Sequence, residues 1–146
     1  MSITDMFTEV LLDHYKHPRH YGVMENADVV HESANPLCGD ELTLYAKFDG
    51  NTLSDVMFEA KACAICTAST SMFSEITKGK SFEEVDSIGD IVHSMFKGDE
   101  LTSEQRHTIG DILALEGVQK LPVRIKCALL VWETWQVIKK DLDQQK

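Results

Sequence analysis

The sequence is poor in several features that define large classes of proteins. It has only 3 prolines and 8 glycines among 146 residues, too few for a linker rich in these residues, and it contains no internal repeat or low-complexity segment. No apolar run is long enough to cross a membrane, and the N-terminus lacks a signal-peptide pattern. We therefore expect a cytoplasmic protein with no membrane partner.

Positive charge is also scarce. The 14 Lys and Arg residues face 24 Asp and Glu residues, which gives a formal net charge of −10. Nonspecific nucleic-acid binding depends on neutralisation of phosphates, so no nucleic-acid partner is expected. The few basic residues that gather near cysteines are either solvated charges or a rim that lowers thiol pKa values and docks an acidic partner. They are Lys61, Lys120, Arg124 and Lys126.

Length and composition predict a single domain that spans residues 1–146. A chain of this length can bury one core but not two. Its 43% hydrophobic and 26% charged residues are ordinary for a globular domain. Strand patterns come first and helical patterns follow. This order predicts an α+β domain in which about three antiparallel strands pack against about five helices.

The predicted sheet occupies residues 28–62. A short strand is expected near Asp28–Glu32. Residues 41–48 then alternate between apolar and polar, Asp49-Gly50-Asn51 is typical of a hairpin turn, and residues 53–62 alternate again. The apolar positions of the two longer strands should share one face. These positions are Leu42, Leu44, Ala46, Phe48, Val56, Phe58, Ala60 and Ala62.

Signals for helix starts and stops occur before and after the predicted sheet. Pro18 follows an amphipathic pattern, Ser81 opens a capping box with Glu84, Thr102 has Gln105 three residues on, and Pro122 suits a first helical position. The expected helices cover residues 2–17, about 64–78, 81–98, 102–117 and about 122–141.

Three of the four cysteines, with one aspartate, form a candidate metal site. In a reducing compartment, metal binding or thiol chemistry is more probable than a disulfide framework. Cys38, Asp40, Cys63 and Cys127 offer three thiolates and one carboxylate, a set that suits tetrahedral Zn²⁺ or iron held with sulfide. The single oxygen ligand leaves a position that can open, as a transfer reaction requires. The competing interpretation is that the cysteines are small buried hydrophobic residues and Asp40 is a turn residue.

The predicted elements place these residues at one end of the domain. Cys38 and Asp40 lie on the loop before the second strand, where Gly39 lets both side chains turn toward one point. Cys63 lies where a strand meets a helix, whose N-terminal N–H groups favour a thiolate. Cys127 heads a stripe that should pack on the sheet, formed with Val131, Trp135, Ile138 and Leu142.

Two other patterns have competing interpretations. Cys66 forms Cys-x-x-Cys with Cys63, as in a thiol oxidoreductase, but no parallel βαβ unit is predicted, which favours a buried helix residue. His14, His17 and His20 have the i, i+3 spacing of a metal site. Their ordinary interpretation is basic side chains at a helix C-terminus.

The sequence resembles the iron–sulfur cluster assembly scaffold family, the IscU-type and NifU N-terminal-like proteins. The resemblance covers essentially the whole chain, and the order and spacing of three segments make it specific. The segments are Leu12-Asp13-His14-Tyr15-Lys16-His17-Pro18-Arg19-His20-Tyr21-Gly22, Asn35-Pro36-Leu37-Cys38-Gly39-Asp40 and Ala62-Cys63-Ala64-Ile65-Cys66-Thr67-Ala68-Ser69.

Within this family the chain is most similar to the SufU-type branch. Lys126 precedes the last cysteine, where IscU-type proteins carry His, and a segment around Asp99–Gln119 is additional to the IscU type. The resemblance implies a cysteine desulfurase as the sulfur donor and a zinc ion as the cofactor. The implied zinc ligands are Cys38, Asp40, Cys63 and Cys127.

We therefore expect a zinc-dependent sulfurtransferase partner of a cysteine desulfurase, rather than a free-standing enzyme. Cys38 should accept the sulfur and pass it to downstream cluster-assembly or apo iron–sulfur proteins. Arg124, almost one helical turn before Cys127, should support a thiolate or persulfide, unless it only pairs with an acidic neighbour. The alternatives are a scaffold that builds a transient iron–sulfur cluster on the same ligands, a structural zinc domain, and a Cys63/Cys66 oxidoreductase.

Overall fold

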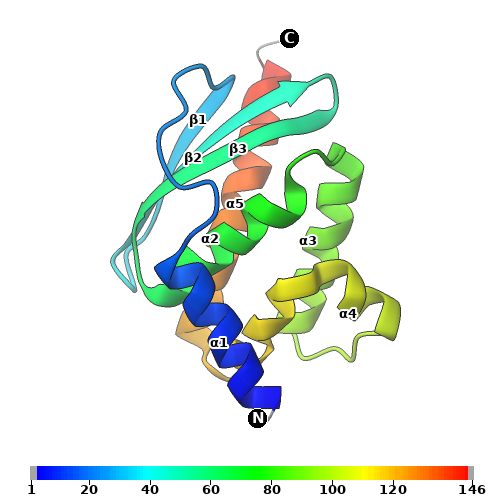
Figure 1. Ribbon diagram of the computed structural model, residues 1–146. Helices are drawn as coiled ribbons and strands as arrows, with labels where there is room; N and C mark the ends of the chain where they lie inside the picture. Colours follow the sequence, from blue (N-terminus) through cyan, green and yellow to red (C-terminus); the bar gives the residue numbers. More distant parts are fainter. Residues whose placement is uncertain (1–2, 145–146) are drawn as a thin grey trace.

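The computed structural model describes residues 3–144, and side chains from residue 7 onward. Within this range the chain forms three strands and five α-helices (Figure 1). In order these are α1 (Ile3–Lys16), β1 (Val29–Asn35), β2 (Asp40–Asp49), β3 (Thr52–Lys61), α2 (Ala64–Thr77), α3 (Phe82–Phe96), α4 (Ser103–Ile109), the 3₁₀ helix η1 (Gly110–Lys120) and α5 (Pro122–Gln144). The predicted α+β class is confirmed.

The sheet is antiparallel, with strand order β1-β2-β3. Alternate residues of β2 from Leu42 to Ala46 are buried, and Val56 and Phe58 of β3 lie directly opposite Ala46 and Leu44. Opposite residues of an antiparallel pair share a face, so these side chains form one apolar surface. The predicted inward face is therefore confirmed.

Strand β1 is longer than the predicted Asp28–Glu32. It continues to Asn35, which pairs with Asp40 at the start of β2. The intervening residues 36–39 form a tight turn, in which the Cys38 N–H donates to the Asn35 carbonyl at 3.2 Å. The first cysteine is thus carried by a short hairpin turn rather than by a long loop.

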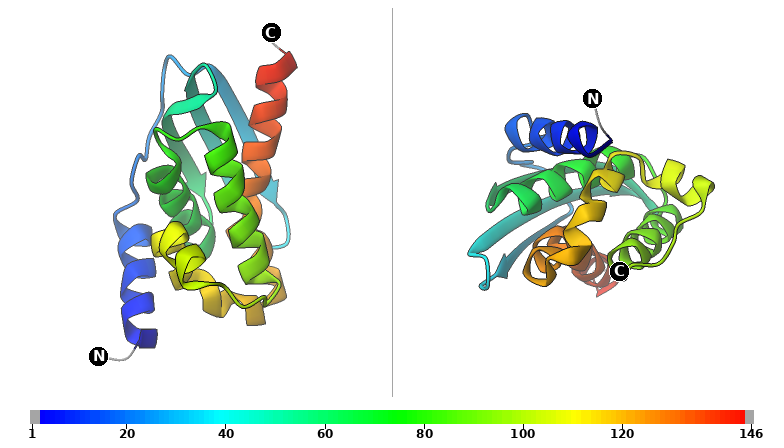
Figure 2. Two further views of the ribbon diagram at one scale, coloured as in Figure 1. Left: turned by 90° about the vertical axis from the view of Figure 1, so that its right-hand side faces the viewer. Right: turned by 90° about the horizontal axis from the view of Figure 1, so that it is seen from below.

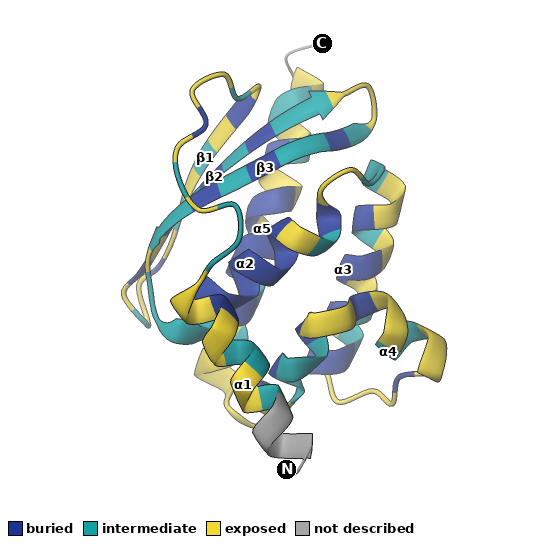
Figure 3. Cartoon of the chain, in the orientation of Figure 1, coloured by how far each residue is buried: buried dark blue, intermediate teal, exposed yellow. Residues whose placement is uncertain are grey.

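Helices α2 and α5 pack against each other and against the sheet (Figures 1 and 2). Helix α1 covers the outer side of α2, and α2 is buried along most of its length (Figure 3). The ring of Phe73 in α2 packs edge-on against Trp132 of α5, with centroids 4.9 Å apart. Trp135 is also buried, so the predicted core stripe of the last helix is confirmed.

The predicted helix over residues 102–117 is wrong in its second half. The capping box of Thr102 and Gln105 is present, but the α-helix ends at Ile109. Gly110 then takes a positive φ of 52°, and the chain continues as the 3₁₀ helix η1. Buried residues recur here at intervals of three, which is the period of a 3₁₀ helix rather than of an α-helix. They are Ile109, Ile112, Leu115 and Val118.

The first helix was predicted over residues 2–17, and α1 ends at Lys16. Residue 2 and the side chains of residues 3–6 lie outside what the structure describes. Over residues 3–144, none of the helices is long and apolar enough to span a membrane.

Candidate metal centre

The four predicted ligands come from three places that meet at one end of the sheet. Cys38 lies on the β1–β2 turn, and Asp40 is the first residue of β2. Cys63 is the N-cap of α2, and Cys127 lies in the second turn of α5. Figure 1 shows the β1–β2 turn at the lower left, beside the beginning of α2. The fold therefore brings together residues that are up to 89 positions apart.

The ligand atoms lie within a few ångströms of one another. The sulfurs of Cys38 and Cys127 are 2.7 Å apart, and all four cysteines are free thiols. One ligand atom each from Cys38, Asp40 and Cys127 lies within 4.8 Å of the others. The Cys63 sulfur lies 3.9 Å from Asp40 Oδ2, which connects it to this group.

The chemistry of this donor set fits a soft divalent cation. Asp40 is only 1% exposed, and its Oδ1 accepts a 2.8 Å hydrogen bond from the Cys63 N–H. A buried carboxylate beside three thiols is costly unless a cation compensates its charge. Three sulfurs and one oxygen are the ligand number and type that tetrahedral Zn²⁺ takes.

The thiols differ in their surroundings. Cys127 is fully buried, whereas Cys38 and Cys63 are half-buried. Burial, with the adjacent Cys38, Asp40 and Cys63 side chains, raises the pKa of the Cys127 thiol. A metal ion that binds here must therefore displace a proton from Cys127.

Cys66 is placed as a helix residue rather than as a redox partner. Its side chain is fully buried, and burial raises the pKa of this thiol to about 12. Its backbone N–H donates to the Cys63 sulfur at 3.4 Å, which caps the N-terminus of α2. The geometry thus disfavours a Cys63/Cys66 oxidoreductase, because its second thiol is neither accessible nor ionised near neutral pH.

Arg124 reaches the site, as its position one turn before Cys127 predicts. Its exposed guanidinium places Nη1 3.9 Å from the Cys38 sulfur. A hydrogen bond to Cys127, with Cys63 and Cys38 nearby, raises the pKa of Arg124. A cation at the open side of a group of thiols can stabilise a thiolate there.

The sequence-based argument missed Asn35, the last residue of β1. Its Nδ2 lies 3.6 Å from the Cys127 sulfur, and its Oδ1 accepts the Leu37 N–H at 3.3 Å. An asparagine directly before the Pro36-Leu37-Cys38 turn is a signal for the bond to Leu37, but not for the contact with Cys127.

The three histidines of the first segment do not converge on one point. His17 is exposed, and His20 Nδ1 lies 3.0 Å from Ser74 Oγ on α2. His14 is fully buried and faces a different set of residues. The metal site that their i, i+3 spacing would allow, which the sequence interpretation disfavoured, is not formed by these three histidines.

His14 instead links helix α1 to α2 and η1 through polar contacts of its ring nitrogens. Its Nδ1 lies 2.8 Å from Ser71 Oγ of α2, and its Nε2 lies 2.9 Å from Asp111 Oδ2 of η1. Glu75 is close to both His14 and Asp111, but it forms an ion pair with Arg19 at 3.5 Å. Each member of this cluster already has a hydrogen-bond or ion-pair partner, which is typical of a structural role.

Exposed apolar side chains lie beside the Cys38 thiol. Leu37, Leu121 and Val123 are 64%, 55% and 50% exposed, and together with Arg124 they line a hollow of about 540 Å³ next to Cys38. Exposed apolar side chains that are grouped in this way are typical of a surface that another molecule covers.

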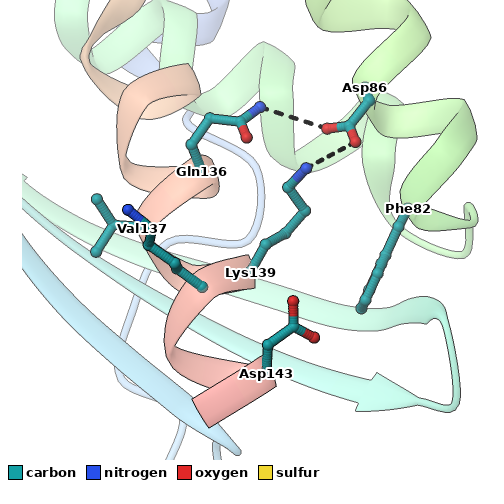
Figure 4. A pocket seen from close by; sticks show the side chains of 7 residues that line it. Phe82, Asp86, Gln136, Val137, Lys139 and Asp143 are labelled. Carbon is teal, nitrogen blue, oxygen red and sulfur yellow. Dashed lines mark hydrogen bonds and ion pairs between the residues drawn. The ribbon is translucent and has the colours of Figure 1, made fainter.

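A second hollow, of about 500 Å³, lies between α3 and the C-terminal half of α5 (Figure 4). In it Asp86 accepts hydrogen bonds from Lys139 at 2.7 Å and from Gln136 at 3.4 Å. Asp86 also accepts the indole N–H of Trp135 at 3.0 Å. These contacts join α3 to α5, and we assign them a role in stabilising the packing of the two helices.

Comparison with known proteins now identifies the family. The NifU-like N-terminal domain matches residues 6–128. The chain belongs to this family. It is 41% identical to the zinc-dependent sulfurtransferase SufU of Bacillus subtilis over 90% of this chain and 88% of that protein. It is 35% identical to the iron–sulfur cluster assembly scaffold protein IscU of Streptococcus pyogenes, over 98% of this chain and 89% of that protein.

A solved structure has the same fold. It is the crystal structure of a protein assigned as an iron–sulfur cluster assembly scaffold for the SUF system, from Fervidobacterium islandicum AW-1. It superimposes with a TM-score of 0.83 at 35% identity and covers 94% of this chain and 98% of that one. The family predicted from the three sequence segments is therefore confirmed, and iron–sulfur cluster assembly of the IscU/SufU type is its function class.

Proposed function

We propose that this protein binds zinc through Cys38, Asp40, Cys63 and Cys127, and that it accepts sulfur from a cysteine desulfurase for iron–sulfur cluster assembly. The observation that carries the proposal is the convergence of three thiols and a buried carboxylate, with one thiol on a half-exposed turn. The SufU relative, which is named a zinc-dependent sulfurtransferase, supports the same conclusion.

Cys38 is the thiol best placed to take up sulfur. It is half-buried on a tight turn beside Gly39, whose φ is +69°, whereas Cys127 is fully buried in a helix and Cys63 is fixed as an N-cap. A turn can move its side chain without disturbing the core. Zinc held by these ligands would keep the thiols deprotonated, so that Cys38, once released from the metal, would attack as a thiolate.

The transfer step is a thiol exchange that conserves electrons. The Cys38 thiolate attacks the terminal sulfur of the desulfurase persulfide, and a new S–S bond forms on Cys38. The S–S bond of the donor breaks, and the donor cysteine leaves as a thiolate, so no external oxidant is required. Arg124, 3.9 Å from the Cys38 sulfur, can stabilise the negative charge of the resulting persulfide.

The desulfurase should dock over the Cys38 end of the domain. Transfer requires contact between the two sulfurs, so the donor must cover the residues that flank Cys38. These include the exposed apolar side chains of Leu37 and Val123 and the exposed basic side chains of Arg124 and Lys126. We propose that the apolar residues provide contact area and that the basic residues orient an acidic rim of the donor.

A scaffold role is the second candidate, because the relative that matches 98% of this chain is named a scaffold protein. In that case iron and sulfide, as cargo, would occupy the same four ligands. Free thiols require a reducing compartment in either case, which supports the cytoplasm as the location.

One experiment separates the two roles. The protein is purified anaerobically and mixed with desulfurase, cysteine and iron, after which bound zinc, iron and sulfide are measured. Retained zinc with faster desulfurase turnover supports sulfur transfer. Replacement of zinc by iron and sulfide, with passage of the cluster to an apo-protein, supports the scaffold.

A further inference from the structure

Asn35 contacts the backbone of Cys38 and the thiol of Cys127. Its backbone carbonyl accepts the N–H of Cys38 at 3.2 Å, and its side-chain Nδ2 donates to the Cys127 sulfur at 3.6 Å. The residue is 7% exposed, and in the sheet it lies directly opposite Asp40. One residue thus borders three of the four proposed ligands.

The orientation of the Asn35 amide follows from its neighbours. Its Oδ1 accepts the Leu37 N–H at 3.3 Å, so this end of the amide must be the oxygen. The NH₂ group is therefore directed at Cys127. The turn-stabilising role that asparagine commonly has accounts for the bond to Leu37 but not for a buried N–H donor aimed at a sulfur.

The sulfurs of Cys38 and Cys127 lie 2.7 Å apart, and both can donate to the Val123 carbonyl, at 3.9 and 3.6 Å. The Cys127 sulfur contacts the buried amide of Asn35, which is fixed at the end of a strand. The Cys38 sulfur lies 3.9 Å from the exposed guanidinium of Arg124, which also interacts with Cys127, so the Asn35 amide is the contact that distinguishes the two sulfurs. A fixed N–H donor to a ligand sulfur holds that ligand in place, as outer-sphere hydrogen bonds do in metal sites.

We infer that Asn35 is a positioning residue that keeps Cys127 as the retained ligand, so that Cys38 is the thiol that exchanges. The inference rests on the proposed function, and it adds the residue that selects between two adjacent sulfurs. Removal of the Asn35 N–H should loosen Cys127 and make both sulfurs available.

Two substitutions separate the sulfur contact from the turn contact. Asn35→Asp keeps an oxygen acceptor for the Leu37 N–H but removes the donor to Cys127. Asn35→Ala removes both contacts and adds no charge. In each variant, zinc loss to a competing chelator should be at least about tenfold faster than in the unaltered protein. After incubation with desulfurase and cysteine, alkylation and peptide mass mapping should find sulfur on Cys127 as well as on Cys38.

The outcomes are distinct. A change in both variants, with melting temperatures of the metal-free proteins close to that of the unaltered protein, supports the inference. If zinc loss and sulfur position change only in Asn35→Ala, the turn contact is the one that matters, and the inference is overturned. If they change only in Asn35→Asp, the added charge is the cause, and the inference is also overturned. If the unaltered protein holds no zinc or takes no sulfur on Cys38, the proposed function itself fails. If it does both and the variants match it, only the role of Asn35 fails.

Discussion

The carboxylate of Asp40 is hydrogen-bonded to the backbone N–H of Cys63 at 2.8 Å. This bond joins the first residue of β2 to the N-cap of α2, and it leaves Asp40 Oδ2 directed toward the thiols, 3.9 Å from the Cys63 sulfur. The same side chain therefore fixes the strand–helix junction and offers an oxygen ligand.

Asp40→Asn should separate these two roles. The amide oxygen can still accept the Cys63 N–H, but a neutral amide is a weaker ligand than a carboxylate. We expect the zinc content per chain to fall, while the melting temperature of the metal-free protein stays the same or rises because a buried charge is removed. Elemental analysis and thermal unfolding in chelator check both. Full zinc content in the variant would show that Asp40 is not a ligand.

Arg124→Glu should lower sulfur uptake and leave the zinc content unchanged. The guanidinium is exposed and lies beside the Cys38 sulfur, so the substitution reverses the charge at the proposed docking rim. Desulfurase affinity should also weaken as salt rises, because exposed pairs are screened within about 8 Å at physiological ionic strength. Lys140→Glu, at an exposed position near the opposite end of α5, is the control. A joint fall in melting temperature and zinc content would instead assign Arg124 a bracing role.

Asp86→Ala should destabilise the protein by roughly 1–3 kcal/mol, because it leaves the indole N–H of Trp135 without its acceptor. The lower half of this range is expected, since Asp86 is partly exposed. Urea unfolding measures the difference, with Asp90→Ala at an exposed position of the same helix as the control. Equal stabilities of the two variants would contradict the assigned role.

The effect of Asp86 should depend on pH. Burial raises the pKa of this carboxyl, but hydrogen bonds from Lys139 and Trp135 outweigh it and hold the pKa below its ordinary value. A lowered pKa means that the contribution is complete above the ordinary value of about 3.9 and is lost as the pH falls below it. The difference between the unaltered protein and Asp86→Ala should therefore shrink in acid.

Gly110→Ala should destabilise the protein by about 1–2 kcal/mol, because φ of +52° is unfavourable for a residue with a side chain. A Cβ at this position would meet no neighbouring atom, so backbone strain is the only expected cost. Gly117→Ala is a matched control, since its Cβ would also lie in open space and its φ is not in the strained range. Equal effects of the two substitutions would contradict the break between α4 and η1.

The sequence predicted the elements whose signals are local and strong. Alternation over residues 41–48 and 53–62 identified the two long strands, and the capping boxes at Ser81 and Thr102 identified two helix starts. The end of α4 was missed because the Thr102 capping box identifies only where a helix begins, and the apolar residues around Gly110 recur every three positions. That spacing is visible in the sequence and separates a 3₁₀ helix from an α-helix.

The sequence indicated which residues lie together at the candidate site, but not what surrounds them. The residue types and the family resemblance pointed to Cys38, Asp40, Cys63 and Cys127, and the fold brings them together. Asn35 could not be assigned a role, because its contact with Cys127 joins residues 92 positions apart. Contacts of this kind depend on how β1 and α5 pack, which no local pattern records.

The most direct test of the sulfur-acceptor account is a parallel measurement of zinc content and sulfur position. The unaltered protein, Cys38→Ala and Cys66→Ala are incubated with desulfurase and cysteine, alkylated and mapped by mass spectrometry. We predict about one zinc per chain and persulfide on Cys38 in the unaltered protein, no uptake by Cys38→Ala, and unchanged uptake by Cys66→Ala. Uptake by Cys38→Ala equal to that of the unaltered protein, or full uptake by zinc-free protein, would contradict the account.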